Sequence, residues 1–255
     1  MPLAELIRAQ RRERELLLMT HIVIGHPDWE TSLALVDAMV AAGVELIELQ
    51  LPFSEPLADG PWIARASQQA VQRGVRVDDC FAFAQRVAAR HPISFLLMSY
   101  YNLVGRRGVG SFVQSSARAG VAGVIVPDLP LEESDEYVAA MRGASLAPIF
   151  MLSPRTPEGR LRALGRAGDG LVYAVARTGV TGSQTELSPE LACYLARCRA
   201  ATELPLAVGF GLKTRDDVQF LVGKADIAIV GSQSLAVLEE GGVGAVKDFL
   251  VSLRA

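Results

Sequence analysis

The sequence predicts an α/β fold of alternating strands and helices, and two observations lead to this expectation. First, the chain contains eight short apolar runs, each too short for a helix and rich in branched side chains. Second, helical stretches separate these runs, and strict alternation is typical of parallel strands joined by right-handed crossovers. Eight such units predict a closed (β/α)8 TIM barrel. An open, doubly wound sheet is the alternative.

The elements are expected in the following order. The strands cover residues 18–24, 46–51, 93–98, 123–126, 148–152, 171–174, 206–208 and 227–230. The helices cover residues 31–42, 63–74, 111–119, 132–141, 157–167, 189–200, 215–222 and 243–253. Residues 3–15 predict a short amphipathic lead-in helix, because Leu3, Leu6 and Ile7 share one face. Residues 77–90 predict an extra helical piece before the third strand.

Composition restricts the architecture and the partners. No linker, low-complexity tract or sharp change in composition divides the 255 residues, so we expect one domain spanning residues 1–255. The net charge of −3, without basic runs, argues against nucleic acid or an anionic membrane as the main partner. No apolar stretch approaches the roughly 18 residues that a membrane span needs. We therefore expect a protein of the cytoplasm.

The cysteines and histidines do not indicate a metal site. The chain has only three cysteines, which is typical of a reduced compartment and not of a disulfide framework. Cys193 and Cys198 would lie about 140° apart on a helix and not on one face. His21, His26 and His91 are scattered without the spacing of metal ligands. We therefore expect no metal.

The chemistry of such a barrel lies at the C-terminal ends of its strands. The second expected strand carries Glu48 between Ile47 and Leu49, and burial there raises the cost of ionising a carboxylate. One interpretation is a core glutamate paired with a buried Lys or Arg. The nearby strands are nearly free of basic residues, so the pattern favours a functional acid that donates or accepts a proton.

The loop that follows this strand is rich in Pro, Gly and acidic residues. Asp59 precedes Gly60 and Pro61, which is also the pattern of a simple turn or N-cap aspartate. The alternative is functional, since the prolines stiffen a loop that would hold Asp59 near Glu48 at the barrel mouth. The local pattern leaves both interpretations open. Farther along, Asp128 ends the fourth strand, where it could cap the next helix or line the site.

Glycines after the last three strands indicate a lid and an anion site. Residues 176–182 contain two glycines and little to bury, which is typical of a lid and also of an ordinary surface loop. Gly209 and Gly211 follow the seventh strand, and Gly231 and Ser232 follow the eighth. Barrels hold phosphate at this place, with backbone N–H groups and the N-terminus of a short helix, here starting near Ser232. Tight turns are the alternative. The combined pattern favours a phosphorylated substrate.

Several blocks of the sequence together resemble one family. The segment IELQLPFSEPLADGP at positions 47–61 closely resembles the signature of the tryptophan synthase alpha chain. Further blocks resemble that family's motifs in order and spacing: YYN at 100–102, VPDLP at 126–130, SPRTP at 153–157, TGVTG at 178–182, GFG at 209–211 and VGS at 230–232. The resemblance thus extends over nearly the whole chain.

The resemblance implies a TIM barrel that splits indole-3-glycerol phosphate into indole and glyceraldehyde 3-phosphate by a retro-aldol reaction, without cofactor or metal. It implies that Glu48 is the general acid/base, which protonates indole C3 and takes the proton of the glycerol hydroxyl. It implies that Asp59 accepts a hydrogen bond from the indole N–H and stabilises the charge that develops there. The implied substrate-binding residues are Tyr173 near the indole and glycerol, Thr181 on the lid, and Gly182, Phe210, Gly211, Gly231 and Ser232 around the phosphate.

The resemblance also implies a partner. Alpha chains of this family dock onto a pyridoxal-phosphate beta chain in an alpha-beta-beta-alpha complex, and indole passes to that chain through a tunnel. Loops resembling residues 52–60 and 176–182 communicate between the two sites. Because indole is apolar and leaks through membranes, enclosing its transfer is chemically sensible.

A few positions depart from the family pattern. His21 stands where the family usually has an apolar aromatic residue beside the indole, and Gln50 replaces a common glycine. Glu55 replaces an aspartate in the loop that signals to the beta chain, and Gly105 stands where a bulky side chain can contact that chain. These changes leave Glu48, Asp59 and the phosphate loops unchanged, so lyase chemistry is expected to remain. They affect the expected substrate and the coupling to the beta chain. His21 is consistent with neutral packing or with a modified substrate.

Three hypotheses follow. The leading one is an indole-3-glycerol-phosphate lyase that works as a tryptophan synthase alpha chain. The second is a specialised relative that works alone or on an altered substrate. The third is a non-catalytic activator that binds a phosphorylated ligand and stimulates a beta chain. Intact Glu48 and Asp59 argue against the third, since a binding module has no need for costly buried acids.

Overall fold

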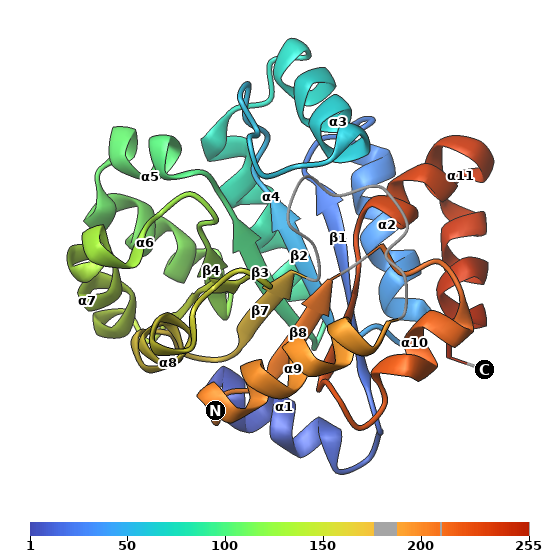
Figure 1. Cartoon of the computed structure of the whole chain (residues 1–255). Coiled ribbons are helices and arrows are strands. Elements are labelled where there is room, and N and C mark those ends of the chain that lie inside the picture. Colours follow the sequence, from blue (N-terminus) through green and yellow to red (C-terminus); the bar gives the residue numbers. More distant parts are fainter. Residues whose placement is uncertain (176–187, 210, 255) are drawn as a thin grey trace.

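A computed structural model describes residues 1–175, 188–209 and 211–254 of the chain (Figure 1). The strands are β1 (Leu17–Val23), β2 (Leu46–Gln50), β3 (Ser94–Met98), β4 (Gly123–Ile125), β5 (Ala147–Ile149), β6 (Met151–Leu152), β7 (Val172–Val175), β8 (Leu206–Gly209) and β9 (Ile227–Val230). The helices are α1 (Leu3–Arg11), α2 (Trp29–Ala41), α3 (Pro61–Gln72), α4 (Val77–Arg90), α5 (Tyr101–Arg107), α6 (Val109–Arg118), η1 (Leu131–Glu133), α7 (Asp135–Gly143), α8 (Glu158–Ala167), α9 (Pro189–Ala201), α10 (Arg215–Leu221) and α11 (Ser232–Ser252).

The strands of the described residues form one parallel sheet that closes on itself. Their order is β5-β4-β3-β2-β1-β9-β8-β7-β6. The two ends of this order, β5 and β6, are separated in the chain only by Phe150. Because β5 pairs with β4 and β6 pairs with β7, one continuous segment joins both edges of the sheet. This segment is the expected strand 148–152, so the eight-stranded barrel is confirmed and the open sheet is wrong.

Helices surround the strands, as the expected alternation requires (Figure 1). The lead-in helix is confirmed as α1, although it ends at Arg11 and not at residue 15, and the extra helix is confirmed as α4. Helix α5 was not expected, because Gly105 interrupts its helical pattern. A contact from another loop supports it: the Asp128 carboxylate accepts a hydrogen bond from the Tyr101 N–H at 2.8 Å. No helix of the described residues is long and apolar enough to cross a membrane.

The last helix begins earlier than the expected bounds of 243–253. Helix α11 starts at Ser232, where the sequence indicated only the N-terminus of a short helix, and it is interrupted at Gly242. Gly242 has φ +72° and ψ −172°, a conformation that is essentially restricted to glycine. Two helical halves therefore meet at this residue, and the first half begins at the mouth of the barrel.

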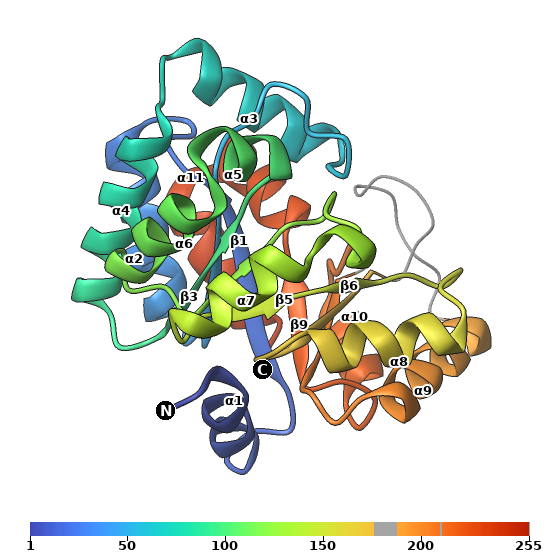
Figure 2. The ribbon, with the colours of Figure 1, turned by 90° about the vertical axis from the view of Figure 1, so that its left-hand side faces the viewer.

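The barrel interior changes from apolar to polar along its axis. Leu17 and Met19 of β1 lie in one buried cluster with Leu46 of β2 and with Leu3 and Ile7 of α1. Helix α1 thus covers the N-terminal end of the barrel, below the strands in Figure 2. Since side chains alternate along a strand, the next inward positions are 21 on β1 and 48 and 50 on β2, and all three are polar. The apolar part of the barrel interior therefore ends at the level of these three polar residues.

Candidate active site

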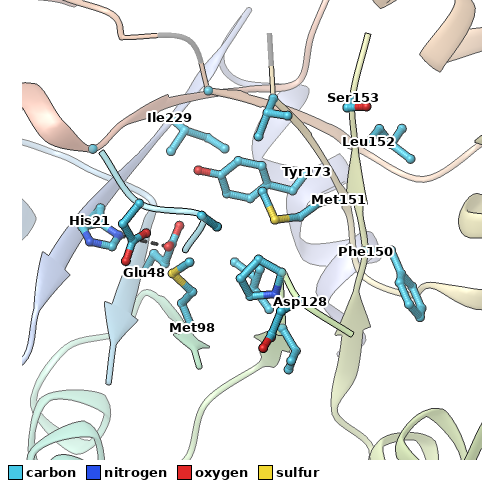
Figure 3. A pocket seen from close by; sticks show the side chains of 18 of the residues that line it. His21, Glu48, Met98, Asp128, Phe150, Met151, Leu152, Ser153, Tyr173 and Ile229 are labelled. Carbon is cyan, nitrogen blue, oxygen red and sulfur yellow. Dashed lines mark hydrogen bonds and ion pairs between the residues drawn. The ribbon is translucent and has the colours of Figure 1, made fainter. Parts of the chain in front are cut away.

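A cavity of about 620 Å³ lies at the C-terminal ends of the strands. Its lining comes from several strands and the loops that follow them, including His21, Glu48, Asp59, Tyr173, Gly211 and Ser232. Figure 3 shows His21, Glu48 and Tyr173 among them. This is the end of the barrel at which the sequence predicts the chemistry. The described substrate-site candidates from distant parts of the chain therefore line one cavity.

Glu48 points from β2 into the barrel, and its side chain is 3% exposed. His21 is its register partner on β1, and the Nδ1 atom of His21 lies 2.9 Å from Oε1 of Glu48 (Figure 3). The interpretation of Glu48 as a core residue paired with Lys or Arg is therefore wrong. The other carboxylate oxygen, Oε2, is buried and has no hydrogen-bond partner among the described residues.

Asp59 is buried in the loop between β2 and α3, and it does not cap that helix. The N-cap of α3 is Gly60, which makes the N-cap interpretation of Asp59 wrong. Instead, Nε2 of the fully buried Gln50 donates a hydrogen bond of 2.6 Å to Oδ2 of Asp59. Burial raises the pKa of Asp59, against the lowering effects of the Gln50 hydrogen bond and the nearby His21. The carboxylate is thus held in a place that disfavours its charge.

Tyr100 holds the loop that carries Asp59. The Tyr100 ring is buried and stacks on Phe53, with ring centroids 5.2 Å apart. Its hydroxyl oxygen accepts a hydrogen bond of 3.0 Å from the N–H of Ala58. Burial, together with the nearby Asp59, raises the pKa of Tyr100, so the phenol stays protonated. The loop is therefore anchored on both sides of its exposed tip, where Leu57 is 82% exposed.

The middle of the cavity is lined largely by apolar side chains. Tyr173 of β7, Met98 of β3 and Ile229 of β9 line it from different sides (Figure 3). Burial raises the pKa of Tyr173, and the carboxylates of Glu48 and Asp59 raise it further, so its hydroxyl group remains neutral. An aromatic ring enclosed here would lie among apolar side chains, with the two carboxylates at one end.

Another part of the cavity wall has the features of an anion site. Gly211, Gly231 and Ser232 line it, and α11 begins at Ser232 with Gly231 as its N-cap. The N-terminus of a helix directs backbone N–H groups and a partial positive charge toward a bound anion. Gln233 lines the same region, although sequence reasoning did not single it out.

Some predicted residues lie outside the described part of the chain. These are Thr181, Gly182 and Phe210, together with the expected lid at 176–182. Of the two departures that bear on the partner, Glu55 is exposed on the loop between β2 and α3, and Gly105 lies on α5. Among the described residues, no group of three or more His, Cys, Asp or Glu side chains is arranged to hold a metal ion.

Sequence reasoning missed how His21 and Gln50 act on the two carboxylates. Both residues stood out only as departures from a family pattern. For Gln50 a signal was available, because it lies two residues after Glu48 on one strand and therefore shares its face. For His21 the signal was weaker, because its pairing with Glu48 depends on the register of β1 against β2. Asp128 lines the cavity, but it supports the start of α5 and not the following helix.

Comparison with known proteins shows the family of the chain. The family model described as "Tryptophan synthase alpha chain" matches residues 7–249. The tryptophan synthase alpha chain of Syntrophotalea carbinolica is 54% identical over 248 residues, which cover 97% of this chain and 98% of that protein. This chain belongs to the tryptophan synthase alpha-chain family. Its activity is that of an indole-3-glycerol-phosphate lyase in tryptophan biosynthesis, as the leading hypothesis states.

Solved structures of the family have the same fold. A structure of tryptophan synthase from Mycobacterium tuberculosis superposes with a TM-score of 0.91 at 34% identity, and the match covers 98% of this chain and 96% of that one. A structure of the tryptophan synthase α2β2 complex from Pyrococcus furiosus superposes with a TM-score of 0.87 at 29% identity, covering 93% and 97%. The barrel predicted from the sequence is thus the fold of the alpha-chain family.

Proposed function

We propose that Glu48 and Asp59 are the catalytic carboxylates of the lyase reaction. One observation carries this proposal: two buried carboxylates line the same end of the cavity, and a neighbouring side chain holds one oxygen of each. Burying an acid costs folding free energy, so an acid retained in a buried place indicates a function, and perturbed carboxylates cluster at active sites. The apolar middle of the cavity would then receive the indole ring beside Tyr173.

The reaction breaks the bond between indole C3 and the neighbouring hydroxyl-bearing carbon of the glycerol chain. As the neutral acid, Glu48 protonates C3, and the ring becomes an indoleninium cation. The resulting carboxylate takes the hydroxyl proton, that carbon becomes the aldehyde carbon, and the electrons of the broken bond return to the ring. Asp59 accepts a hydrogen bond from the ring N–H and stabilises its positive charge. Glu48 gives one proton and regains one, so it is unchanged.

We infer that the phosphate binds where Gly211, Gly231 and Ser232 line the cavity, at the N-terminus of α11. By resemblance to the family, we also propose Gly182 and Phe210 as phosphate-binding residues and Thr181 as the substrate-binding threonine of the lid. In these steps the protonated indole ring itself accepts the electrons of the broken bond, so we propose that the reaction needs no cofactor or metal. We also propose that residues 1–255 act as one domain.

We propose that a pyridoxal-phosphate beta chain is the partner and that the complex works in the cytoplasm. The α2β2 assembly named for the Pyrococcus furiosus relative supports the partner, and the sparse cysteines support the compartment. Titration of the chain with a beta chain should give a complex at micromolar concentration and faster release of indole. Absence of a complex would favour the hypothesis of a stand-alone lyase.

Replacement of Glu48 by Gln tests the catalytic proposal. Glu48→Gln should lower indole release from indole-3-glycerol phosphate by at least about 100-fold, because general acid–base catalysis contributes about that much or more. Binding of indole-3-propanol phosphate, an analogue without the reacting hydroxyl, should change little. The matched control is Glu45→Gln, since Glu45 is also buried but lies before β2, at the opposite end of the barrel.

The two variants have opposite expected outcomes. Glu45→Gln should lower the melting temperature and keep kcat, whereas Glu48→Gln should lose kcat and stay folded. Parental turnover by Glu48→Gln would contradict the catalytic proposal and would favour the non-catalytic activator if the chain still stimulated a beta chain.

A further inference from the structure

The contact between His21 and Glu48 results from the pairing of two neighbouring barrel strands, β1 and β2. The two residues are register partners on adjacent strands, and both side chains point inward at the level where the apolar interior ends. Their side chains are only 4% and 3% exposed. The Nδ1 atom of His21 lies 2.9 Å from Oε1 of Glu48. Water therefore has little access to this contact, and its geometry is set by the pairing of β1 with β2.

The contact distinguishes the two oxygens of the Glu48 carboxyl group. Oε1 faces the imidazole, whereas Oε2 is buried without a hydrogen-bond partner among the described residues, on a side chain that lines the cavity. A neutral carboxylic acid has one carbonyl oxygen, which accepts hydrogen bonds, and one hydroxyl oxygen, which carries the proton. If Nδ1–H of His21 donates to Oε1, then Oε1 is the carbonyl oxygen and the acid proton is on Oε2.

We propose that His21 is a positioning residue, which donates from Nδ1 to Oε1 of Glu48 and thereby keeps the reactive proton on Oε2. This inference rests on the proposed role of Glu48 and adds a residue to it. His21 does not exchange a proton with the substrate. Oε2 gives its proton to indole C3, and the same oxygen takes the hydroxyl proton, while the hydrogen bond to Oε1 persists in both forms of the carboxyl group.

The hydrogen bond acts through orientation and through charge. It restricts rotation of the carboxyl group, so that Oε2 keeps one fixed position, and small misplacements of a reacting group are costly to rate. It also becomes stronger when Glu48 is the anion, because hydrogen bonds to ionised acceptors are stronger than those between neutral groups. Orientation favours both proton transfers, whereas the charge effect favours the transfer from Oε2 to C3, and both leave substrate binding largely unaffected.

Variants at position 21 separate positioning from packing. His21→Phe keeps an aromatic ring of similar size and removes the donor, so kcat should fall about tenfold to a hundredfold, in line with the loss of one hydrogen bond to a charged group. KM and the affinity for indole-3-propanol phosphate should stay within about twofold. His21→Asn places an amide N–H near the position of Nδ1 and should recover most of kcat. His21→Gln places its amide nearer the position of Nε2 and should not.

A second histidine provides a matched control. His91 places Nε2 2.7 Å from Oδ1 of Asp37 on α2, so it forms a similar pair away from the cavity. His91→Phe should therefore affect thermal stability without changing kcat. If His21→Phe fails to fold, the comparison of His21→Asn with His21→Gln decides the question, because both carry an amide and differ in its reach.

The outcomes distinguish failure of this inference from failure of the proposed function. Parental kcat in His21→Phe, together with an inactive Glu48→Gln, would overturn the positioning role and leave the catalytic role of Glu48 intact. Equal losses of kcat in the Asn and Gln variants would also overturn it, because position-specific rescue would then be absent. Parental turnover by Glu48→Gln would overturn the proposed function and this inference together.

Discussion

At the scale of single residues, Asp59 is a carboxylate in surroundings that disfavour its charge. Burial raises its pKa above the ordinary value of 3.8. The folded chain therefore binds this proton more tightly than the unfolded chain does. Stability is gained as the pH falls through the raised pKa toward about 4, and above the raised pKa the cost of burying the anion is fully present.

Asp59→Asn should therefore stabilise the fold and abolish most activity. The neutral amide removes the cost of burying a charge and keeps an oxygen that can accept from Nε2 of Gln50. The melting temperature should rise by a few degrees at neutral pH, and the gain should shrink as the pH is lowered toward about 4. Thermal unfolding across this pH range checks the expectation. A gain that is constant with pH would contradict a raised pKa as its cause.

Gln50 provides a second prediction at this scale. Its Nε2 donates the 2.6 Å hydrogen bond to Asp59, and its side chain is fully buried. Gln50→Leu keeps a similar volume and removes the donor, so Asp59 loses one of the contacts that hold it at the proposed indole site. Indole release should fall about tenfold, the effect expected for one hydrogen bond to a charged group. Steady-state kinetics test this, and unchanged kcat/KM would mean that the loop holds Asp59 without Gln50.

At the scale of elements, α11 consists of two helical halves that meet at Gly242 and pack in different places. Its first half begins at the cavity and places Leu235 in a cluster with Ile63 and Ala66 of α3, whereas its second half buries Val246 and Leu250. The helix packs on both α2 and α3 beside the barrel (Figure 1). The break at Gly242 lets the second half take a different direction from the first. An unbroken helix would continue straight in the direction in which it leaves the barrel mouth.

Gly242→Ala should destabilise the chain by about 1–3 kcal/mol, the cost of placing a side chain in a conformation restricted to glycine. A Cβ atom at position 242 would meet nothing within 4 Å, so the cost comes from the backbone alone. The melting temperature should fall by about 2–4 °C for each kcal/mol. Gly244→Ala is the matched control: its residue is helical and equally open, so it should stabilise slightly. Equal effects of the two substitutions would refute the backbone argument.

At the scale of the whole molecule, the end of the barrel opposite the cavity is joined by charged contacts between distant segments. Asp226, just before β9, accepts hydrogen bonds from the N–H of Leu206 at 2.7 Å and from the guanidinium groups of Arg199 and Arg11. Burial acts to raise the pKa of Asp226, but these hydrogen bonds and the charge of Arg199 outweigh it and lower the pKa. The segment before β1 is thereby joined to α9 and β8.

Asp226→Asn should lower stability by about 2 kcal/mol at neutral pH, the order expected for hydrogen bonds to a charged group. Because the pKa of Asp226 is lowered in the folded chain, its contribution is present above the ordinary value of 3.8 and is lost as the pH falls through the lowered value. The difference in melting temperature from the parent should therefore vanish in acid, while kcat stays unchanged. Asp248→Asn, at an exposed position on α11, is the control and should have little effect.

The order of the elements could be predicted from the sequence because its signals are local. A run of branched apolar residues such as residues 227–230 indicates a buried strand, and the expected strands lie within one residue of the observed bounds. Local signals failed where the structure depends on distant contacts. Helix α5 is supported by Asp128 from another loop, and the first half of α11 continues into a glycine break that resembles a helix end.

The sequence by itself determined the alternation of strands and helices, the family and its reaction, and the presence of acids among apolar residues. Only the tertiary structure decided the partners of those acids. His21 and Glu48 are 27 residues apart in the chain, and they meet because β1 and β2 pair in one register, since a shift by one residue would turn a side chain to the other face. A single strand's pattern carries no information on register. For this physical reason, the hydrogen bond that orients Glu48 could be known only from the folded barrel. The bond from Gln50 to Asp59 depends instead on how the loop after β2 folds back over that strand.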